Sequence, residues 1–351
     1  MRVGLLYGRN VFQTGVKRYA EELEHGLRAA GDDVTRIEIA RRELKLGRWR
    51  AGGFLSFWLA RLTAAPGRHD VLHALDPAVV VRGTDVVTVH DLTQEIYPEW
   101  YQRHRAARWD IAVTRAIAHR VPWVIADSDV TRSEVISRWG VKPERIVTVR
   151  LGVDQSKFRP TAEGSPLLAK EKPNLVYTGD DNPRKNLMLA VRAVAKLRES
   201  EGIDARLIRL GPSRHPEVHG PYREFAAKHR VDLVEPGFVD EKELVGVLSH
   251  ADAFLWPPLA EGFGFPPLEA MSCGLPVVAL DTPINREICG AVSEYHPGDP
   301  TAMASAVERM LREPPQRDRI LAHARTFTWE RTVRETQAVY ARVRDARVDL
   351  R

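Results

Sequence analysis

Short apolar runs alternate with helical stretches along the whole chain. This alternation is typical of parallel sheets whose strands are joined by crossover helices. A polar stretch at residues 159–173, which contains proline and glycine, interrupts it once, and we interpret this stretch as a linker. The predicted strands are 2–7, 34–39, 70–75, 85–90, 122–127 and 145–150 before it, and 175–179, 206–211, 232–239, 252–256, 276–280 and 293–296 after it.

Each half of the chain therefore looks like one doubly wound α/β domain. At 351 residues the chain exceeds the usual size of a single core, and its composition is that of an ordinary globular protein. We expect one domain at residues 1–160 and the other at 161–328. Residues 329–351 are predicted to form a C-terminal helix whose loose apolar stripe could pack back on the first domain. Ligands bind at the carboxyl ends of strands in such sheets, so the expected site is a cleft between the domains.

Cysteine content and hydropathy indicate the compartment. The chain has two cysteines, Cys273 and Cys289, which form no metal-type pair and no disulfide framework, and this fits a reducing cytosol. The apolar run at the N-terminus is too short for a signal peptide, and nowhere do about 18 apolar residues follow one another. We therefore expect a cytoplasmic protein that does not span a membrane.

Basic residues cluster in one segment. The formal net charge of +5 is modest, so an anionic partner is indicated only where charge gathers, between Arg36 and Arg50. An aromatic-rich helical run follows, and together they make Arg36–Trp58 a candidate for peripheral contact with the inner face of the membrane. A solvated loop before a core-packed helix explains the same pattern. No aromatic platform or reader motif accompanies the arginines, so no nucleic-acid partner is expected.

Two carboxylates, Glu261 and Glu269, flank a glycine-rich turn. The turn runs into a helix of about two turns that we expect to begin at Pro267, because a proline restrains the residue before it and suits the first helical position. Both carboxylates and the free N–H groups of residues 262–265 can then border one small volume. Such a volume suits a polyhydroxylated, negatively charged ligand.

Structural roles explain these two carboxylates less well. With Pro267 first in the helix, Glu269 would be third, where a glutamate usually bonds to the N–H of the capping residue. That residue would be Pro266, which has no N–H, although a boundary shift of one or two residues would restore the capping role. Glu261 could be a solvated loop acid, but the aromatic residues on both sides of it make an idle charge costly.

Two cations, Arg184 and Lys185, lie at the mouth of a helix after the first strand of the second half. A helix N-terminus and two cations together form an anion site that can hold a diphosphate without a metal. The alternative is surface charge before a helix. That alternative is weak for Lys185, because a cation at a helix N-terminus opposes the macrodipole.

His90 and Gly15 are the candidates in the first half. His90 follows a predicted strand, where it could accept a proton, orient a hydroxyl or bond to a backbone carbonyl, while Asp91 suits a turn cap. Gly15 links the first strand to the first helix and would let a ligand approach the backbone, or would simply start the helix. The surrounding residues do not form a GxGxxG motif, so the dinucleotide fingerprint is absent.

No metal site is predicted. Asp127 and Asp129 form an Asp-x-Asp motif that can hold a divalent cation, but a capping box that begins at Thr131 explains them as turn and cap residues. His215 and His219 have helical ligand spacing, yet a proline lies between them and no third ligand is evident. The nucleophile elbow, the Walker loop and the zinc-protease helix motif are absent, which weakens hydrolase and ATPase interpretations.

Taken in order, these motifs resemble glycosyltransferase family 4. The resemblance covers nearly the whole chain and implies a type B glycosyltransferase fold, with two Rossmann-like domains around a deep cleft. It also implies that a hexose-type sugar passes from a nucleotide diphosphate sugar to an acceptor hydroxyl with retention at the anomeric carbon, and that no cofactor is needed. The matching segments are Val89–Leu92, Leu151–Asp154, Pro183–Asn186, Gly237–Val239, Glu261–Glu269 and Leu268–Val277.

The resemblance also implies roles for individual residues. Arg184 and Lys185 would bind the diphosphate, and His90 would lie on the acceptor side near the 6-hydroxyl of the sugar. Glu269 would bind the ribose and Glu261 the donor sugar. The implied catalytic residues are thus His90, Arg184, Lys185 and Glu261. The other donor-binding residues would be Gly15 near the phosphates, Gly211, Gly237, Phe238 and Val239 near the base, and Gly262, Phe263, Gly264, Phe265 and Leu268 with Glu269.

Three features depart from the family pattern. Asp180 stands where many members carry an arginine, Pro257–Pro258 replaces the usual Pro-Ser, and the first domain contains the arginine-rich segment. Two alternatives therefore stay open: a nucleotide-sugar epimerase of the same fold, and a protein that binds a nucleotide sugar without catalysis. The sequence does not identify the base, the sugar or the acceptor, which could be a glycan, a lipid carrier or a small molecule.

Overall fold

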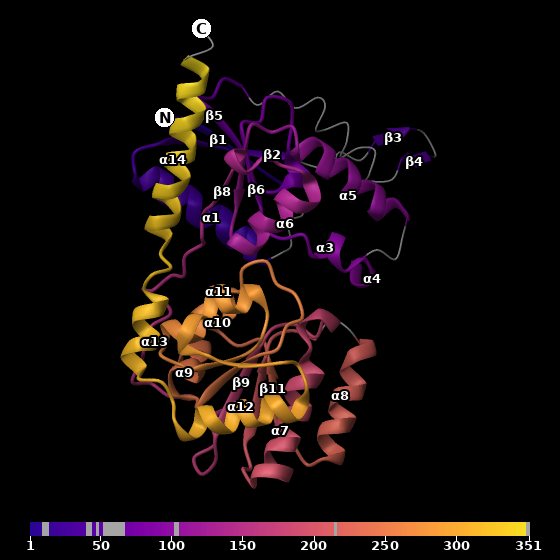
Figure 1. Ribbon diagram of the computed structural model, residues 1–351, viewed down its shortest axis with the longest axis vertical. Coiled ribbons are helices and arrows are strands. Elements are labelled where there is room, and N and C mark those ends of the chain that lie inside the picture. Colours follow the sequence, from indigo (N-terminus) through magenta and orange to yellow (C-terminus); the bar gives the residue numbers. More distant parts are fainter. Residues whose placement is uncertain are drawn as a thin grey trace. The chain divides into compact units, whose positions relative to one another are not determined.

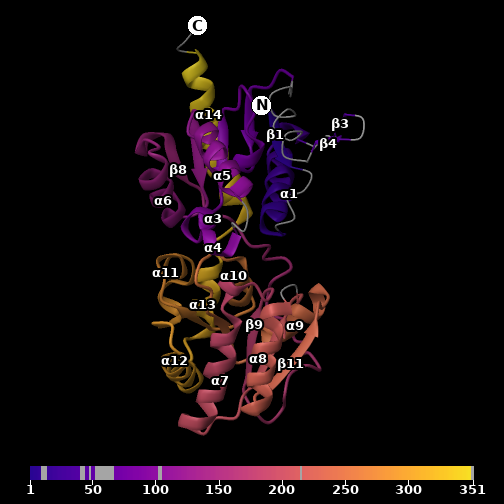
Figure 2. The same cartoon turned by 90° about the vertical axis from the view of Figure 1, so that its right-hand side faces the viewer.

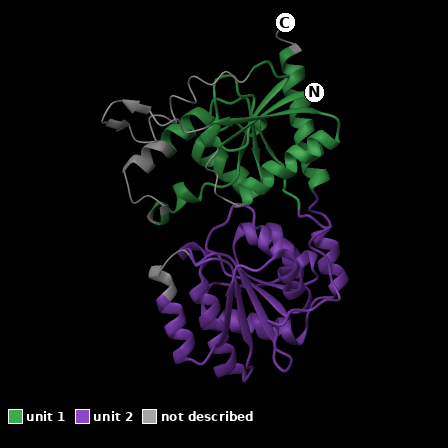
Figure 3. Cartoon of the chain, turned by 180° about the vertical axis from the view of Figure 1, so that it is seen from behind, with its two compact units in different colours: residues 1–152, 329–351 green, residues 153–328 purple. Residues whose placement is uncertain are grey.

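The computed structural model divides the chain into two compact units (Figure 3). Unit 1 comprises residues 1–152 and 329–351, and unit 2 comprises residues 153–328. Residues 159–173, which we interpreted as a linker, belong to unit 2. The residues that the structure describes are 1–8, 14–39, 44–46, 49–51, 67–101, 105–213 and 216–348.

Unit 1 is built on a six-stranded parallel sheet, strands of which are labelled in Figure 1. The order of its strands is β2-β1-β5-β6-β7-β8. The central strands are buried on both faces, which explains why they read as continuous apolar runs. All six were predicted to within a few residues. They are β1 (Arg2–Gly8), β2 (Asp33–Ile39), β5 (Val71–Ala74), β6 (Val86–Val89), β7 (Trp123–Ala126) and β8 (Ile146–Thr148); β3 (Leu44–Leu46) and β4 (Trp49–Ala51) form a separate antiparallel pair.

The helices of unit 1 include the last one of the chain, α14 (Trp329–Val348), which packs against α1 (Thr14–Ala29). The two helices approach so closely that a Cβ on Gly26 would lie 2.3 Å from Cγ2 of Val333. Tyr340 of α14 is fully buried, and its hydroxyl lies 2.7 Å from Nδ1 of His73 in β5. Helix α14 is therefore part of the core of unit 1. The other helices are η1 (Pro77–Val79), α3 (Thr93–Ile96), α4 (Pro98–Tyr101), α5 (Arg105–Ala118), α6 (Asp129–Trp139) and η2 (Pro143–Arg145).

Unit 2 contains a second six-stranded parallel sheet, with the order β11-β10-β9-β12-β13-β14. The chain runs outward from β9 to β11, then returns to the centre, so that β12 pairs with β9. This is the doubly wound order in which ligands bind where the direction of progression reverses. The strands are β9 (Asn174–Thr178), β10 (Arg206–Leu210), β11 (Asp232–Gly237), β12 (Ala253–Trp256), β13 (Val277–Leu280) and β14 (Glu294–His296).

Helices α7, α8 and α12 pack on one face of this sheet (Figure 2). Buried side chains such as Val191, Tyr222 and Met303 join these helices to Leu207 and Leu255 of the strands. No helix within the described ranges is long and apolar enough to cross a membrane. The helices of unit 2 are η3 (Pro183–Lys185), α7 (Leu187–Glu201), α8 (Pro216–Lys228), α9 (Glu241–His250), α10 (Phe265–Ser272), α11 (Pro283–Cys289), η4 (Gly290–Val292), α12 (Pro300–Arg312) and α13 (Arg317–Ala324).

Candidate functional site

The loops that follow β9 and β12 meet at the carboxyl edge of the sheet in unit 2. Two hydrogen bonds join them. The Leu259 N–H donates to the Arg184 carbonyl at 2.8 Å, and the side-chain amide of Asn186 donates to the Pro257 carbonyl at 3.2 Å. The reversal of strand order thus brings together two motifs that are far apart in the sequence.

Arg184 and Lys185 lie in the 3-10 turn η3, which is separate from helix α7. The side chain of Asn182 caps this turn by accepting a hydrogen bond from the Arg184 N–H at 3.1 Å. Asn186 then takes a left-handed backbone conformation, with φ of 55°, and the chain turns into α7. Because of this turn, both cations are placed before the helix begins and not in its first turn.

Both cations bind the carboxylate of Glu261. Arg184 Nη1 donates to Oε1 at 2.8 Å, and Lys185 Nζ donates to the same oxygen at 2.6 Å. The side chains of Glu261 and Lys185 are only 11% and 12% exposed, so water screens their attraction weakly. Burial raises the pKa of the Glu261 carboxyl, but the charges and hydrogen bonds of Lys185 and Arg184 outweigh burial and hold the pKa below its usual range. Within these three side chains the cations exceed the carboxylate by one charge.

Further contacts fix the two cations in place. Arg184 Nη1 also donates to the Ala260 carbonyl at 3.0 Å. Lys185 Nζ lies 5.1 Å from the ring centroid of Trp256, a side chain that is fully buried at the end of β12. A cation over an aromatic face is attracted by the ring quadrupole. These contacts hold the three side chains of the cluster in place without a ligand, and the two cations make the cluster suited to an anion.

Three glycines, Gly179, Gly211 and Gly237, end the neighbouring strands β9, β10 and β11. The Gly179 N–H donates to the Leu210 carbonyl at 2.9 Å, and the Gly211 N–H donates to the Gly237 carbonyl at 3.0 Å. Gly211 has a φ of 134°, and a Cβ there would lie 2.4 Å from the carbonyl oxygen of Gly179. Only glycine fits at this position. We call this row the glycine strip; it presents bare backbone that a flat ligand can approach closely.

Phe238 follows the glycine strip and is the most exposed large apolar side chain among the described residues. Its side chain is 88% exposed, directly after Gly237 at the end of β11. An aromatic ring beside bare backbone can stack on a flat, unsaturated ligand. The predicted neighbours of a nucleotide base, Gly211, Gly237 and Phe238, thus lie on adjacent strand ends.

Helix α10 begins earlier than the sequence predicted. Its first residue is Phe265, and Gly264 with φ of 98° precedes it as the N-cap, so the prediction that Pro267 comes first is wrong. Prolines at the second and third positions cost no hydrogen bond, because the first N–H groups of a helix have no partner within it. Glu269 is consequently fifth in the helix and 8% exposed. A capping box is excluded, because its third position is Pro267; the predicted length of about two turns is confirmed.

Two predicted donor-binding residues of this segment have core side chains. Leu268 is fully buried, and Phe263 is 5% exposed, with its ring centroid 5.6 Å from that of Phe265 and 6.1 Å from that of Phe327. Phe263 and Leu268 can therefore meet a ligand through their backbone but not through their side chains. Gly262 and Gly264 have no side chain, so the whole turn offers mainly main-chain groups.

In unit 1, His90 follows β6 and bridges the ends of the two neighbouring strands. Its Nε2 lies 3.0 Å from the Leu75 carbonyl oxygen after β5, and its Nδ1 lies 3.4 Å from Oδ2 of Asp127 after β7. The ring also packs edge-on against Tyr19, with 5.0 Å between centroids. Of the roles left open by the sequence, the structure shows the contact with a backbone carbonyl. The contact with Asp127 was not predicted.

The residues of the Asp-x-Asp motif have different structural roles. Ser128 caps α6 by accepting a hydrogen bond from the Thr131 N–H at 3.0 Å, and Asp129 accepts one from the Thr148 hydroxyl at 2.6 Å. Asp127 instead faces His90. No group of three His, Cys, Asp or Glu side chains that could hold a metal ion occurs in the part of the chain that is described. His215 and the side chain of His219 lie outside that part.

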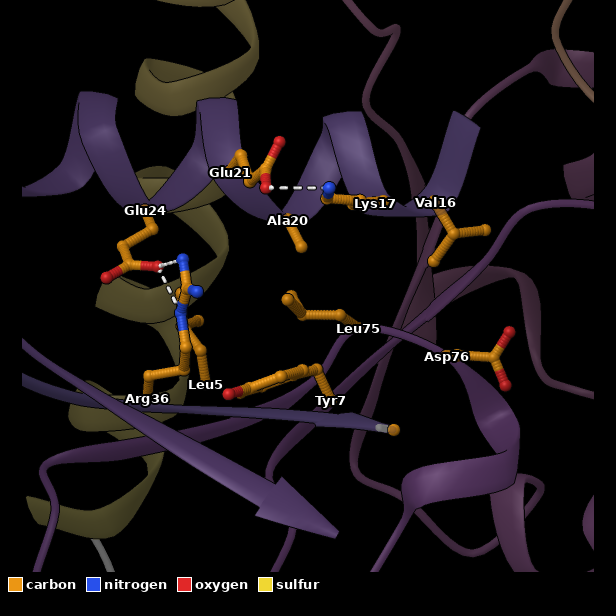
Figure 4. A pocket seen from close by; sticks show the side chains of 11 residues that line it. Leu5, Tyr7, Val16, Lys17, Ala20, Glu21, Glu24, Arg36, Leu75 and Asp76 are labelled. Atoms are coloured by element: carbon orange, nitrogen blue, oxygen red, sulfur yellow. Dashed lines mark hydrogen bonds and ion pairs between the residues drawn. The ribbon is translucent and has the colours of Figure 1, made fainter. Parts of the chain in front are cut away.

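A pocket of about 180 Å³ lies between β1 and α1 in unit 1 (Figure 4). Its apolar wall includes Leu5, Tyr7, Val16 and Leu75. The carbonyl oxygen of Leu75 is also the partner of His90 Nε2, so the pocket and the histidine both contact the end of β5. The pocket therefore lies at the reversal point of the first sheet, between β1 and β5.

The charges on the rim of this pocket are paired with each other. Lys17 Nζ lies 3.7 Å from Oε1 of Glu21, one turn further along α1. Arg36 of β2 donates from Nε to Oε2 of Glu24 at 2.7 Å, and both pairs are visible in Figure 4. Asp76, also on the rim, caps η1 by accepting a hydrogen bond from the Ala78 N–H. The rim thus combines hydrogen-bonding groups with little net charge among the described residues.

Two predictions fall largely outside the described residues. Gly15 lies in the first turn of α1, but residues 9–13 before it are not described. In the segment Arg36–Trp58, Arg36 is paired with Glu24, whereas residues 40–43, 47–48 and 52–58 are not described. The contact of this segment with a membrane stays a prediction.

Two family models match consecutive parts of the chain. The model described as Glycosyltransferase Family 4 matches residues 13–157, and the model described as Glycosyl transferases group 1 matches residues 158–327. O-antigen chain mannosyltransferase B of Escherichia coli is 28% identical over 275 residues, 73% of this chain and 69% of that protein. MMP alpha-(1->4)-mannosyltransferase of Mycolicibacterium hassiacum is 28% identical over 255 residues, and the chain spans only 59% of its length.

Solved structures show the same architecture. Sucrose-phosphate synthase from Thermosynechococcus elongatus matches with a TM-score of 0.78 and 20% identity, over 99% of this chain and 100% of that one. Anabaena HepE, in complex with UDP and glucose, matches with a TM-score of 0.72 and 16% identity, over 96% of this chain and 99% of that one. These matches confirm the predicted fold, two Rossmann-like domains of the type B glycosyltransferase class. With its two matched models covering residues 13–327, the chain belongs to the glycosyltransferases of group 1 and family 4.

Proposed function

We propose that the protein is a retaining glycosyltransferase that moves a hexose from a nucleotide diphosphate sugar to an acceptor hydroxyl without a metal ion. The observation that carries this proposal is the cluster of Arg184, Lys185 and Glu261 where the strand order of unit 2 reverses. Its net positive charge and its low exposure match a diphosphate, the group that leaves when the sugar is transferred.

Breaking the bond between sugar and phosphate builds negative charge on the diphosphate and positive charge on the sugar ring. Lys185 and Arg184 would stabilise the negative charge. Glu261 would serve first as the group that holds both cations in place, and its carboxylate would then lie beside the positive sugar. One carboxylate thus accounts for both the arrangement of the cations and the contact with the donor sugar.

The rest of the donor would extend along the carboxyl edge of unit 2. The glycine strip and Phe238 are suited to the flat base, and Glu269 on α10 to the ribose hydroxyls. The main-chain groups of the turn 262–265 are suited to the sugar, since they carry hydrogen-bonding groups without side chains that would fill the space.

Retention is proposed to proceed by attack on the face from which the diphosphate leaves. The acceptor O–H bond breaks as the leaving phosphate oxygen takes its proton, and the new sugar–oxygen bond forms on the same face. No side-chain nucleophile is required. A covalent adduct between the sugar and any side chain, detected by mass spectrometry of the protein during turnover, would contradict this mechanism.

The pocket of unit 1 is proposed as part of the acceptor site. It combines the apolar wall at Tyr7 and Leu75 with hydrogen-bonding groups on the rim, a pattern suited to a polyhydroxylated molecule with an apolar face. Glycans, the sugar of a lipid carrier and small aglycones all have this chemistry. Because the described rim charges are internally paired, an uncharged acceptor fits better than an anionic one.

A donor screen tests the proposal directly. The melting temperature of the protein would be measured with GDP-mannose, UDP-glucose and other nucleotide sugars, since the two relatives described above are mannosyltransferases and HepE was crystallised with UDP and glucose. A donor that stabilises the protein is then incubated with acceptors. Transfer with retained anomeric configuration supports the proposal. Conversion of the donor alone indicates an epimerase, and binding without turnover across the acceptor panel indicates a non-catalytic binding protein.

Glu269→Gln is expected to weaken nucleoside diphosphate binding roughly ten- to hundredfold, because a hydrogen bond to a charged group contributes about 1.5–3 kcal/mol. Calorimetry with the ribonucleotide and its 2′-deoxy analogue provides the measurement. The wild type should prefer the ribonucleotide, whereas the variant should bind both with similar affinity. Glu294→Gln on the edge strand β14 is the matched control and should keep the wild-type preference. If Glu269→Gln keeps it as well, the ribose assignment is wrong.

A further inference from the structure

His90 and Asp127 face each other because their strands are in register. Strands β6 and β7 pair with Val89 opposite Ala126, so the residues that follow both strands lie at the same level of the carboxyl edge. The distance from His90 Nδ1 to Asp127 Oδ2 is 3.4 Å, and Asp127 is only 1% exposed. A buried carboxyl group is costly unless it is paired. The contact with His90 is therefore the main interaction that compensates for the burial of Asp127, and a hydrogen bond from the side chain of Thr131 contributes less.

The other ring nitrogen of His90 determines where the hydrogens lie. Nε2 lies 3.0 Å from the Leu75 carbonyl oxygen, which can only accept, so Nε2 carries a hydrogen. Nδ1 then either donates to an ionised Asp127 or accepts from a protonated one. Without a hydrogen between them, the lone pairs of His90 Nδ1 and Asp127 Oδ2 would face each other at 3.4 Å and repel. In both favourable states His90 has no nitrogen left to accept a proton from a substrate.

The surroundings favour the state with the proton on the histidine. Burial lowers the pKa of His90, but the hydrogen bond and charge of Asp127, with the charge of Asp76, outweigh burial and raise it above the usual value. Burial raises the pKa of Asp127 only to about 6. The neighbouring titratable groups are His73 of β5, which burial keeps neutral with a pKa of about 3, Asp76 after β5, Tyr19 of α1, Asp91 after β6 and Glu134 of α6.

The ring is also held sterically by a chain of buried hydrogen bonds. Tyr19, which packs edge-on against His90, bonds to the Thr88 hydroxyl at 2.9 Å. Thr88 in turn lies 2.8 Å from Nε2 of His73, and His73 Nδ1 lies 2.7 Å from the Tyr340 hydroxyl of α14. A ring packed against such a chain and bonded at both nitrogens has little freedom to turn.

We propose that Asp127 is the positioning residue of His90 and holds the imidazole in one orientation with a hydrogen on each nitrogen, so that His90 acts as a fixed cation and not as a proton acceptor. The inference rests on the proposed function, in which the acceptor proton goes to the leaving phosphate. His90 itself does not line the pocket, but it bonds to Leu75, which does. A fixed imidazolium at this position is suited to stabilise negative charge in the transition state.

The sign of the pH dependence of turnover separates the two roles of His90. As a fixed cation, His90 should lose its effect when the pH rises through its raised pKa, because the proton between Nδ1 and Oδ2 is then lost and turnover falls. As a proton acceptor, His90 would become active over the same range, and turnover would rise. A kcat that increases with pH through this range and depends on His90 would overturn the proposal.

A titration without substrates tests the protonation state itself. In the full chain labelled at histidine nitrogen, NMR should show His90 protonated on both nitrogens at neutral pH. Asp127→Asn should lower the pKa of His90 by about 1–3 units, the usual effect of a close carboxylate. Asp91→Asn is the matched control, since it removes a carboxylate beside His90 that bonds instead to the Thr93 N–H at 2.9 Å, and it should shift the pKa less. Equal shifts, or none in Asp127→Asn, would overturn the proposal.

The same variant also separates orientation from charge in the reaction. In Asp127→Asn the amide can donate to Nδ1 of a neutral His90, so the orientation is kept and the cation is lost. We expect kcat to fall on the order of tenfold with the KM for the donor nearly unchanged, and the alkaline fall in turnover to disappear. His90→Gln should show the same loss of kcat and of the alkaline fall with Asp127 intact, which keeps the test decisive if Asp127→Asn folds poorly.

Full turnover with an unchanged pH profile in either variant would overturn the proposal. If no donor supports transfer, the proposed function fails, whereas the NMR titration still decides the state of His90.

Discussion

Lys185→Ala is expected to lower turnover at least about ten- to hundredfold, because the lost ammonium group stabilises the departing diphosphate. Hydrogen bonds to charged groups contribute about 1.5–3 kcal/mol, and each 1.36 kcal/mol of barrier corresponds to a tenfold change in rate. Lys185 is expected to act more strongly in the transition state than in the bound donor, so kcat should fall more than KM rises. Steady-state kinetics with the donor identified by the thermal screen provide the measurement.

The control for this variant is Lys172→Ala. Lys172 is also a lysine of unit 2 that pairs with two carboxylates, Asp204 at 3.1 Å and Asp232 at 3.0 Å, but it precedes β9 at the opposite edge of the sheet. Its removal should leave turnover within about twofold of the wild type, since exposed ion pairs contribute little. Near-normal turnover in Lys185→Ala would refute the diphosphate assignment. Loss of activity in both variants would indicate a general effect on unit 2.

Gly211→Ala is expected to destabilise unit 2 by about 3 kcal/mol and to abolish detectable donor binding. The alanine would be forced into a backbone conformation with φ of 134°, and its Cβ would meet the Gly179 carbonyl oxygen at 2.4 Å. Backbone strain of this kind costs about 1–3 kcal/mol and overpacking a similar amount. Relief requires that the strands β9 and β10 separate where the base is proposed to bind, so stability and affinity should fall together.

Gly202→Ala provides the comparison for Gly211→Ala. Gly202 ends helix α7 with φ of 69°, and no atom lies within 4 Å of the position its Cβ would take. The left-handed conformation alone should cost about 1 kcal/mol, with donor affinity unchanged. Chemical denaturation and calorimetry on both variants would check this. Equal destabilisation of the two variants would show that contact with Gly179 contributes nothing.

The strands could be predicted because burial on both faces makes each strand of a parallel sheet a continuous apolar run. The Arg184 and Lys185 motif and the Glu261 motif could also be predicted as site residues, because ligands bind at the carboxyl ends of parallel strands and charged side chains there can contact them. Their direct contact could not be predicted. It depends on β12 pairing with β9, and no local pattern specifies which strands become neighbours across a crossover.

The two errors about the site have local physical causes. The start of α10 was placed at Pro267 because proline disfavours helix in the residue before it, whereas Gly264 with positive φ lets the helix begin at Phe265. The predicted capping box at Thr131, which explained Asp127 as a turn or cap residue, is wrong, because the N-cap of α6 is Ser128 and Asp127 faces His90. The register between β6 and β7 brings His90 and Asp127 together. This register could not be predicted from the sequence of either strand alone.

The path of the chain has a consequence for biosynthesis. Unit 2 is one continuous segment, residues 153–328, whereas the core of unit 1 needs α14 from the other end of the chain, including the buried Tyr340. During translation, residues 1–152 emerge first but lack the helix that covers α1 and β5. Unit 2 is therefore the first of the two units whose residues have all left the ribosome. The apolar faces of α1 and β5 that α14 covers stay uncovered until residues 329–348 have also left the exit tunnel.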